Sequence, residues 1–345
     1  MIAATSRRTV WINLLALGAV LASAAAVVGQ NAAAQNPAAH FLNVSYDPTR
    51  ELYRDVDTAF VADYAARSGK RLDILQSHGG SSRQARAVID GLPADVVTLA
   101  LRSDIDALVR RGLIDPAWQA RLPNDSLPYT STIVFVVRQG NPKAIHDWPD
   151  LVRPGVSIVT PNPKTSGNGK LSFLAAWGSV IRAGGDEASA RQFLARLYQR
   201  VAVLDDGARG AATRFAEEKT GDVHLTWENE ALREVADSRG ELAIVYPRVS
   251  IRAEPYVAWV DANVKRKHSE AEAKAYLEFL YGARGQELIA AHGYRPIDPA
   301  VLAAHRDRFP PLDLFSIGAL AGGWEQAEQK FFAEGAIFDQ LQGPR

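Results

Sequence analysis

The 345-residue sequence predicts an α/β fold in two lobes, with mostly parallel sheets that carry helices on both faces. Strand-like apolar runs alternate with helical patterns along most of the chain, and this alternation is typical of parallel sheets. Because 47% of the residues are hydrophobic and 23% are charged, the chain can bury a sizeable core. Its length favours two domains or lobes over one.

The N-terminal segment has the three parts of a signal peptide. Arg7 and Arg8 precede an apolar run from Val10 to Val28, and alanine-rich sequence follows. A basic start, an apolar middle and a small-residue exit are the pattern of a processed export signal. We therefore expect a signal peptide over residues 1–34, with cleavage near residues 32–34 or earlier, near 22–26. A transmembrane anchor is the alternative interpretation.

The first part of the mature chain is predicted to form three strand and helix pairs. The strands are expected at Phe41–Tyr46, Leu72–Leu75 and Asp95–Ala100. Asp47 and Pro48, residue types common at a helix start, follow the first strand. After the third pair, the proline-containing segment 122–130 is the predicted crossover between the lobes.

The second part continues the alternation. Further strands are expected at Thr132–Arg138, Val156–Thr160, Val201–Leu204, Val223–Thr226 and Leu242–Tyr246. Three of them lead into helices that begin near residues 165–169, 206–210 and 227. The first two of these junctions are rich in glycine and small polar residues.

Four strand-to-helix junctions are predicted to bind an anion. They are Tyr46-Asp47, Ser77–Ser82, Thr165–Gly169 and Asp206–Gly210. The first N–H groups of a helix have no partner within the helix and carry partial positive charge. In α/β sheets these junctions gather at the carboxyl ends of the strands. Ser166 adds a hydroxyl donor, and Trp227 is either an indole N–H donor or a core aromatic residue.

Composition and motifs argue against several other function classes. The formal net charge is +0, which makes general nucleic-acid binding a poor interpretation. The absence of cysteine excludes disulfides, thiol nucleophiles and thiolate metal sites. "GNGKL" lacks the spacing of a phosphate-binding nucleotide loop, and the sequence has neither a GxSxG elbow nor an HExxH motif. His78, in the predicted glycine loop, is read as a structural residue or a titrating neighbour of the site. We expect no enzyme activity, no metal and no cofactor.

A set of longer motifs carries a resemblance to a known family. They are "LNVSYDPTRELY" (Leu42–Tyr53), "QSHGGS" (Gln76–Ser81), "LPYTSTIVFVVRQGNPKAIHDW" (Leu127–Trp148), "PNPKTSG" (Pro161–Gly167), "LAAWG" (Leu174–Gly178), "VLDDGARGA" (Val203–Ala211), "WENEA" (Trp227–Ala231), "YRP" (Tyr294–Pro296) and "GGW" (Gly322–Trp324). In this order and spacing, the chain resembles the bacterial periplasmic sulfate/thiosulfate-binding proteins. The resemblance covers essentially the whole mature chain.

The resemblance implies a type II-like periplasmic binding protein fold with the ligand in the cleft between lobes. Residues 35–126 and 249–345 would form lobe 1, and residues 127–248 lobe 2. The implied sulfate donors are the N–H groups of Asp47, Ser81, Gly167, Asn168 and Ala208, the Ser166 hydroxyl and the Trp227 indole.

Three residues near these donors carry expectations of their own. Asn168 departs from a glycine frequent in the family, and it would keep its backbone contact if it adopts the glycine's dihedral angles, which asparagine tolerates in the left-handed region. The Asp47 carboxylate is expected to turn to local capping. Arg209, beside Ala208, is expected either to stabilise a helix end rather than contact the ligand, or to be a surface arginine.

The implied function is that of an exported periplasmic receptor. It would bind sulfate or thiosulfate and deliver the anion to the membrane permease of an ABC importer, acting as a monomer without a cofactor or nucleic acid. Molybdate and tungstate are weaker ligand alternatives. An exported hydrolase of sulfate or phosphate esters, using the same anion-binding loops, is the alternative function.

Overall fold

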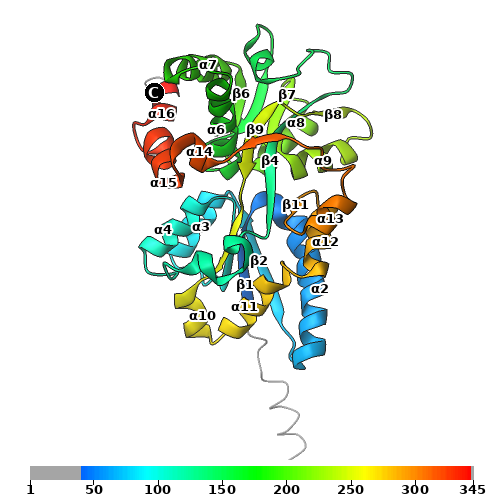
Figure 1. Ribbon diagram of the computed structural model, residues 1–345, viewed down its shortest axis with the longest axis vertical. Helices are drawn as coiled ribbons and strands as arrows, with labels where there is room; N and C mark the ends of the chain where they lie inside the picture. The colour runs from blue at the N-terminus through cyan, green and yellow to red at the C-terminus, as the bar shows by residue number, and fades with distance from the viewer. Residues whose placement is uncertain (1–39, 343–345) are drawn as a thin grey trace, which may run out of the picture.

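The computed structural model describes residues 40–342, which form two lobes stacked along the long axis of the molecule (Figure 1). One sheet has the strand order β10-β3-β1-β2, and the other has the order β12-β9-β4-β7-β5-β6, with β8 and β11 also paired to β4. Helices flank both sheets, so the α/β prediction is confirmed. The expectation of mostly parallel strands fails in the second sheet, where β4 forms four antiparallel pairs. The predicted signal peptide, residues 1–34, lies outside the described residues. In the described part of the chain, no helix is long and apolar enough to cross a membrane.

The first sheet is built largely from the N-terminal part of the chain. Its elements are β1 (His40–Tyr46), a 3₁₀ turn η1 (Asp47–Thr49), α2 (Arg50–Ser68), β2 (Asp73–Gly79), α3 (Ser81–Ile89), β3 (Val96–Leu99), α4 (Arg102–Arg110), β10 (Tyr256–Trp259), α10 (Asp261–Lys267), α11 (Glu270–Phe279) and α12 (Ala283–Ala291). β1 runs parallel to β2 and β3, while β10 pairs antiparallel with β3. The carboxyl ends of β1 and β2 therefore lie at the same edge, where η1 and α3 begin.

The helix α2 shows how the local sequence sets the packing of this lobe. Leu52, Val56, Phe60 and Tyr64 recur every four residues and are buried, as expected for the core-facing stripe of a helix. The helix ends at Gly69, whose φ of 70° is left-handed and costs little in glycine. α2 thereby covers the sheet and extends from the edge at which η1 starts.

The second sheet is mixed. It contains β4 (Tyr129–Arg138), β5 (Ile158–Pro161), β6 (Val201–Asp205), β7 (Val223–Trp227), β8 (Leu242–Val245), β9 (Val249–Ala253), β11 (Arg295–Pro296) and β12 (Asp313–Phe315). β5 runs parallel to β6 and β7, whereas β4 is antiparallel to β7, β8, β9 and β11. The long strand β4 enters from the first lobe rather than through a helical crossover, and this explains why it opposes its neighbours.

The helices of the second lobe include those that begin at the predicted anion loops. They are α6 (Gly167–Arg182), α7 (Glu187–Gln199), α8 (Ala208–Ala216) and α9 (Glu228–Asp237). The C-terminal segment adds α13 (Pro299–Ala304), α14 (Ile317–Ala321), α15 (Trp324–Ala327), the π-helical η4 (Glu328–Phe332) and α16 (Ile337–Gln342). α16 packs on α7, and β12 pairs with β9.

The chain crosses between the lobes more than once. α10 to α12 accompany the first sheet, while β12 and α14 to α16 lie with the second (Figure 1). The predicted lobe boundaries at residues 126/127 and 248/249 stay a prediction. A division that follows the sheets would assign residues 313–342 to the second lobe.

Candidate anion-binding site

A small cavity lies where the two lobes meet. Its walls contain all the residues predicted to donate to an anion: Asp47, Ser81, Ser166, Gly167, Asn168, Ala208 and Trp227. Tyr46, Pro48, Gly79, Gly80 and Ala100 complete the lining. The cavity volume is only about 10 Å³, far below the roughly 300–1,000 Å³ of pockets for drug-sized ligands, so the cavity suits an ion of a few atoms.

Three helices present their N-termini at the cavity. α3 begins at Ser81, α6 at Gly167 and α8 at Ala208, and none of the three has a side-chain cap hydrogen bond. By contrast, Asp186 and Ser316 cap α7 and α14 elsewhere in the second lobe. The first N–H groups of the three helices thus have no partner within their helices, and each helix adds partial positive charge.

The Ser81 hydroxyl already has both a hydrogen-bond acceptor and a donor within the protein. It donates to Asp104 Oδ2 at 2.5 Å and accepts from the Ala100 N–H at 3.0 Å. Ser82 Oγ donates to the other oxygen of the same carboxylate at 2.9 Å. Burial raises the pKa of Asp104, although Lys170 and the two hydroxyls lower it. Asp104 therefore fixes the first turn of α3 and leaves the Ser81 backbone N–H for the cavity.

Trp227 brings a buried donor without a partner. It is the last residue of β7 and the N-cap of α9, and its side chain is 0% exposed. Its Nε1 has no acceptor among the described residues. The indole packs against Tyr46 of the facing lobe, with ring centroids 5.4 Å apart. Because most buried polar groups are paired, this N–H calls for an acceptor in the cavity.

Two residues at the start of α6 line the cavity, one as the N-cap and the other from within the helix. Ser166 is the N-cap of α6, is buried, and makes no cap hydrogen bond with its side chain. Asn168 lies inside the α-helix and is not among the residues with positive φ. The left-handed conformation considered for Asn168 is therefore not needed, because a right-handed helical residue already presents its N–H at a helix start.

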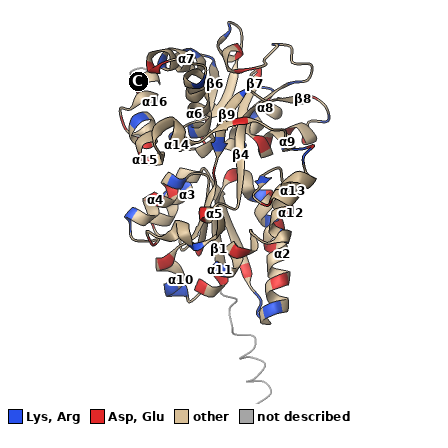
Figure 2. Ribbon diagram, in the orientation of Figure 1, with Lys and Arg blue, Asp and Glu red and all other residues tan. Residues whose placement is uncertain are grey.

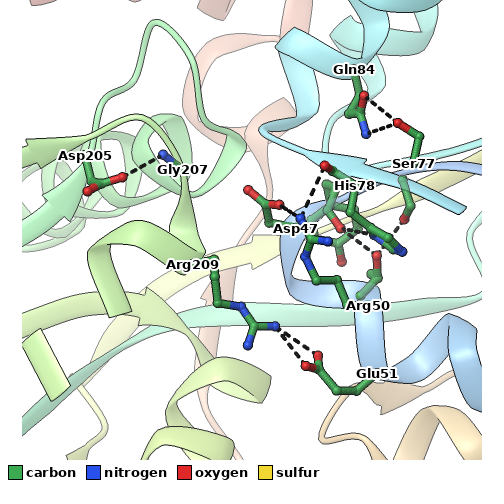
Figure 3. Close-up of polar contacts among 12 residues, drawn as sticks. Asp47, Arg50, Glu51, Ser77, His78, Gln84, Asp205, Gly207 and Arg209 are labelled. Atoms are coloured by element: carbon green, nitrogen blue, oxygen red, sulfur yellow. Dashed lines mark hydrogen bonds and ion pairs between the residues drawn. The ribbon is translucent and has the colours of Figure 1, made fainter. Parts of the chain in front are cut away.

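The Asp47 carboxylate forms an ion pair rather than a cap. Its Oδ1 accepts from Arg50 Nη2 at 2.9 Å, and η1 has no side-chain cap hydrogen bond (Figure 3). The expectation of local capping is thus wrong in detail, because Arg50 one turn later offers a stronger, charged donor. No lysine, arginine or histidine is among the described residues that line the cavity.

His78 lies at the end of β2 rather than in a loop. Its Nδ1 is 3.4 Å from the Tyr46 carbonyl oxygen, and its own carbonyl accepts from Arg50 at 3.3 Å (Figure 3). Burial is the main cause that lowers the pKa of His78 to about 4; the hydrogen bond to the Tyr46 carbonyl raises the pKa, and the nearby Arg50 lowers it. His78 is therefore neutral in neutral solution and does not line the cavity.

Charged side chains join the lobes beside the cavity. Arg209 of α8 donates to both Glu51 oxygens at 3.0 Å, and Arg233 of α9 contacts the same carboxylate at 2.9 Å (Figure 3 shows the first pair). Arg209 thus lies in the first turn of α8 and forms an ion pair across the cleft, so it is not a free surface arginine. Arg233 also reaches Glu230, whose pKa burial raises to about 7 although Arg233 and Arg209 lower it.

The backbones of the two lobes also approach closely. A Cβ placed on Gly80 would lie 2.5 Å from the Thr165 carbonyl oxygen, and one on Gly167 would lie 2.7 Å from the Ala100 Cβ. Arg83 of the first lobe pairs with the Asp206 side chain of the second at 2.9 Å, and within the second lobe Thr165 Oγ1 donates to the Asp206 carbonyl at 2.8 Å. The structure is therefore a closed arrangement in which glycine provides the contact surface.

The profile of a protein family described as "Bacterial extracellular solute-binding protein" matches residues 49–295. The chain belongs to this family. It lies within the sulfate- and thiosulfate-binding group of these solute-binding proteins, since its curated relatives carry those names at high identity.

The relatives match over almost their full lengths. A thiosulfate-binding protein of Pseudomonas aeruginosa is 48% identical over 334 residues, covering 96% of this chain and 98% of the relative. A sulfate-binding protein of Salmonella typhimurium is 51% identical over 302 residues, covering 87% and 92%. Among solved structures, the sulfate-binding protein SubI from Mycobacterium tuberculosis H37Rv has a TM-score of 0.78 at 33% identity, covering 85% of this chain and 99% of that one.

Some residues of this solute-binding protein's cleft were not predicted from the sequence. Asp104, which orients Ser81, lies in a helical pattern that gives no sign of contact with the glycine loop. Glu51, which meets two arginines of the other lobe, looks like an ordinary first-turn acid. The sequence shows only that these residues are charged and lie in helices, which is also true of many residues on solvated helix faces.

Proposed function

We propose that the protein is an exported periplasmic receptor that binds sulfate or thiosulfate between its lobes and delivers the anion to an ABC-type membrane importer. Asp47, Ser81, Gly167, Asn168 and Ala208 donate from backbone N–H groups. Ser166 donates from its hydroxyl and Trp227 from its indole. The receptor acts as a monomer and needs no cofactor.

One observation carries this proposal. Donors from five separate segments and from both lobes surround a single ion-sized cavity, and one of them, Trp227 Nε1, is fully buried without an acceptor within residues 40–342. Backbone N–H, hydroxyl and indole groups can replace the hydration shell of an anion. A set made of donors disfavours ligands that carry their own proton, because a proton facing a donor leaves both unpaired. The names of the relatives support sulfate and thiosulfate as ligands.

The hydrolase alternative has less support. No group of three histidine, aspartate or glutamate residues within residues 40–342 is placed to hold a metal ion. The Ser81 hydroxyl, considered as a nucleophile, donates to Asp104, and no histidine base contacts it among the described residues. Lysine and arginine are interspersed with acidic residues in both lobes (Figure 2), in keeping with a small anionic ligand rather than nucleic acid.

Titration calorimetry tests the proposal. The protein is refolded from denaturant in sulfate-free buffer, to remove bound anion, and titrated with sulfate, thiosulfate, molybdate and phosphate. We expect tight binding of sulfate or thiosulfate and much weaker binding of phosphate at pH 8. Failure of both sulfur oxyanions to bind, with a folded protein, would refute the proposal.

A further inference from the structure

The Asn168 side chain is a buried polar group that the seven donors leave unexplained. It lines the cavity at the second position of α6 and is 1% exposed. Its Oδ1 accepts a hydrogen bond from Ser172 Oγ at 3.0 Å, whereas its Nδ2 has no acceptor among the described residues. A buried amide N–H in this position is unfavourable unless something supplies an acceptor.

We propose that the Asn168 carboxamide is a specificity-determining donor, which adds a side-chain N–H to the bound anion beside the backbone N–H of the same residue. Ser172 is its positioning residue, because the hydroxyl holds Oδ1 and so turns Nδ2 toward the ligand. This inference rests on the proposed function. It adds to that function the selection of fully ionised tetrahedral oxyanions over protonated ones.

The physical reason lies in the two faces of a carboxamide. Its oxygen accepts and its nitrogen donates, so a turn of the group exchanges an acceptor for a donor at the same place. The backbone N–H groups at the starts of α3, α6 and α8 cannot turn into acceptors in this way. A turned Asn168 carboxamide would therefore offer an acceptor to a protonated ligand such as hydrogen phosphate, whereas the Asp47 carboxylate is engaged by Arg50. Ser172, one helical turn later on the same face, holds the carboxamide in the donating orientation.

Two substitutions of Asn168 separate a ligand contact from a packing role. Asn168→Ala removes the donor and should weaken sulfate binding roughly fivefold to 100-fold. Asn168→Asp keeps the shape but places a carboxylate beside the anion. It should weaken binding more strongly at pH 8 and recover affinity as the pH falls, because the protonated carboxyl group donates again. A group that only fills space would not produce this pH profile.

Ser172→Ala tests the positioning role. Without the hydroxyl the carboxamide is free to turn, and we expect the ratio of sulfate affinity to phosphate affinity to fall at least severalfold at pH 7. In the double variant Asn168→Ala/Ser172→Ala, the Ser172 substitution should have no further effect on this ratio. The thermal unfolding of each ligand-free variant reports separately on folding.

The outcomes distinguish this inference from the proposed function. If the wild type binds sulfate and both Asn168 variants bind it equally well at every pH, the inference is overturned while the function stands. If Ser172→Ala leaves the sulfate-to-phosphate ratio unchanged, the positioning role is overturned. If the wild type binds neither sulfate nor thiosulfate, the proposed function fails first and this inference fails with it. Should Asn168→Ala not fold, the isosteric Asn168→Asp variant decides alone.

Discussion

Replacing Trp227 by phenylalanine removes one donor and keeps most of the ring. The indole is 0% exposed and lines the cavity, and its Nε1 has no acceptor in the part of the chain that the structure describes. In the complex this N–H would donate to a charged oxygen, and such hydrogen bonds contribute roughly 1.5–3 kcal/mol. Because about 1.4 kcal/mol corresponds to a tenfold change in Kd, Trp227→Phe should raise the Kd for sulfate roughly tenfold to 150-fold.

The chain offers a matched control in Trp259. Its side chain is 7% exposed, and its Nε1 also has no partner among the described residues. Trp259 nevertheless lies in β10, away from the cavity and beneath the guanidinium of Arg121 at 4.7 Å. Trp259→Phe makes the same chemical change and creates a similar void, so its effect on thermal stability should resemble that of Trp227→Phe. Its effect on sulfate affinity should be less than about twofold.

The assay is calorimetric titration of both variants and the wild type in sulfate-free buffer, with thermal unfolding of the ligand-free proteins measured alongside. The reasoning predicts a change in affinity that is specific to Trp227. Equal affinities for the wild type and Trp227→Phe would show that the indole does not contact the anion. Equal losses in the two variants would show that the effect comes from general destabilisation.

Four further predictions concern closure and pH. Gly80→Ala should weaken sulfate binding, because the new Cβ would lie 2.5 Å from a backbone oxygen of the other lobe, and it should leave the ligand-free protein as stable as before. With sulfate present, small-angle scattering should show a larger radius of gyration for the variant than for the wild type. An identical profile would contradict this prediction. Glu51→Gln should raise the rate of sulfate dissociation a few fold and reduce the effect of salt on that rate, because the carboxylate meets two arginines only across the closed cleft. An unchanged dissociation rate in stopped-flow measurements would argue against a role of the Glu51 ion pairs in closure. His78→Asn should leave the pH dependence of affinity unchanged between pH 5 and 8, because burial lowers the pKa of His78 to about 4. Affinity should instead rise slightly as the pH falls through 7, because burial, with a smaller contribution from Glu51 of the facing lobe, raises the pKa of Glu230 to about 7 in the closed structure. Glu230→Gln should remove this slope.

Local patterns in the sequence account for most of the elements near the site. The predicted strand Phe41–Tyr46 became β1 at His40–Tyr46, and Thr132–Arg138 became part of β4. These runs are long and strongly apolar, so burial decides their conformation. β2 is longer than predicted and takes in Gln76–Gly79, because pairing with β1 outweighs the turn preference of glycine.

The parts that could not be predicted depend on how the lobes meet. α7 (Glu187–Gln199) was not predicted, although Asp186 caps it and Ala190, Phe193, Leu194 and Leu197 are buried at helical spacing, and that signal was available in the sequence. The Glu51 contacts are different, since their partners are 158 and 182 residues away in the chain. No local pattern specifies such a pairing, which appears only when the lobes close.

The nature of the donors explains why residue types alone say so little about this site. A backbone N–H is present in every residue but proline, so Asp47 and Ala208 need only lie at a helix start, and their side chains are free to do other work or none. Residue type does indicate where the two lobes approach too closely for a side chain. Gly80 has a φ of −56°, which any residue adopts, and Gly167 is helical, so neither glycine is required by its backbone conformation. Both are required because a Cβ at either place would meet the facing lobe within 2.7 Å. In this cleft the glycines therefore mark where closure occurs, while the helix starts mark where the anion would bind.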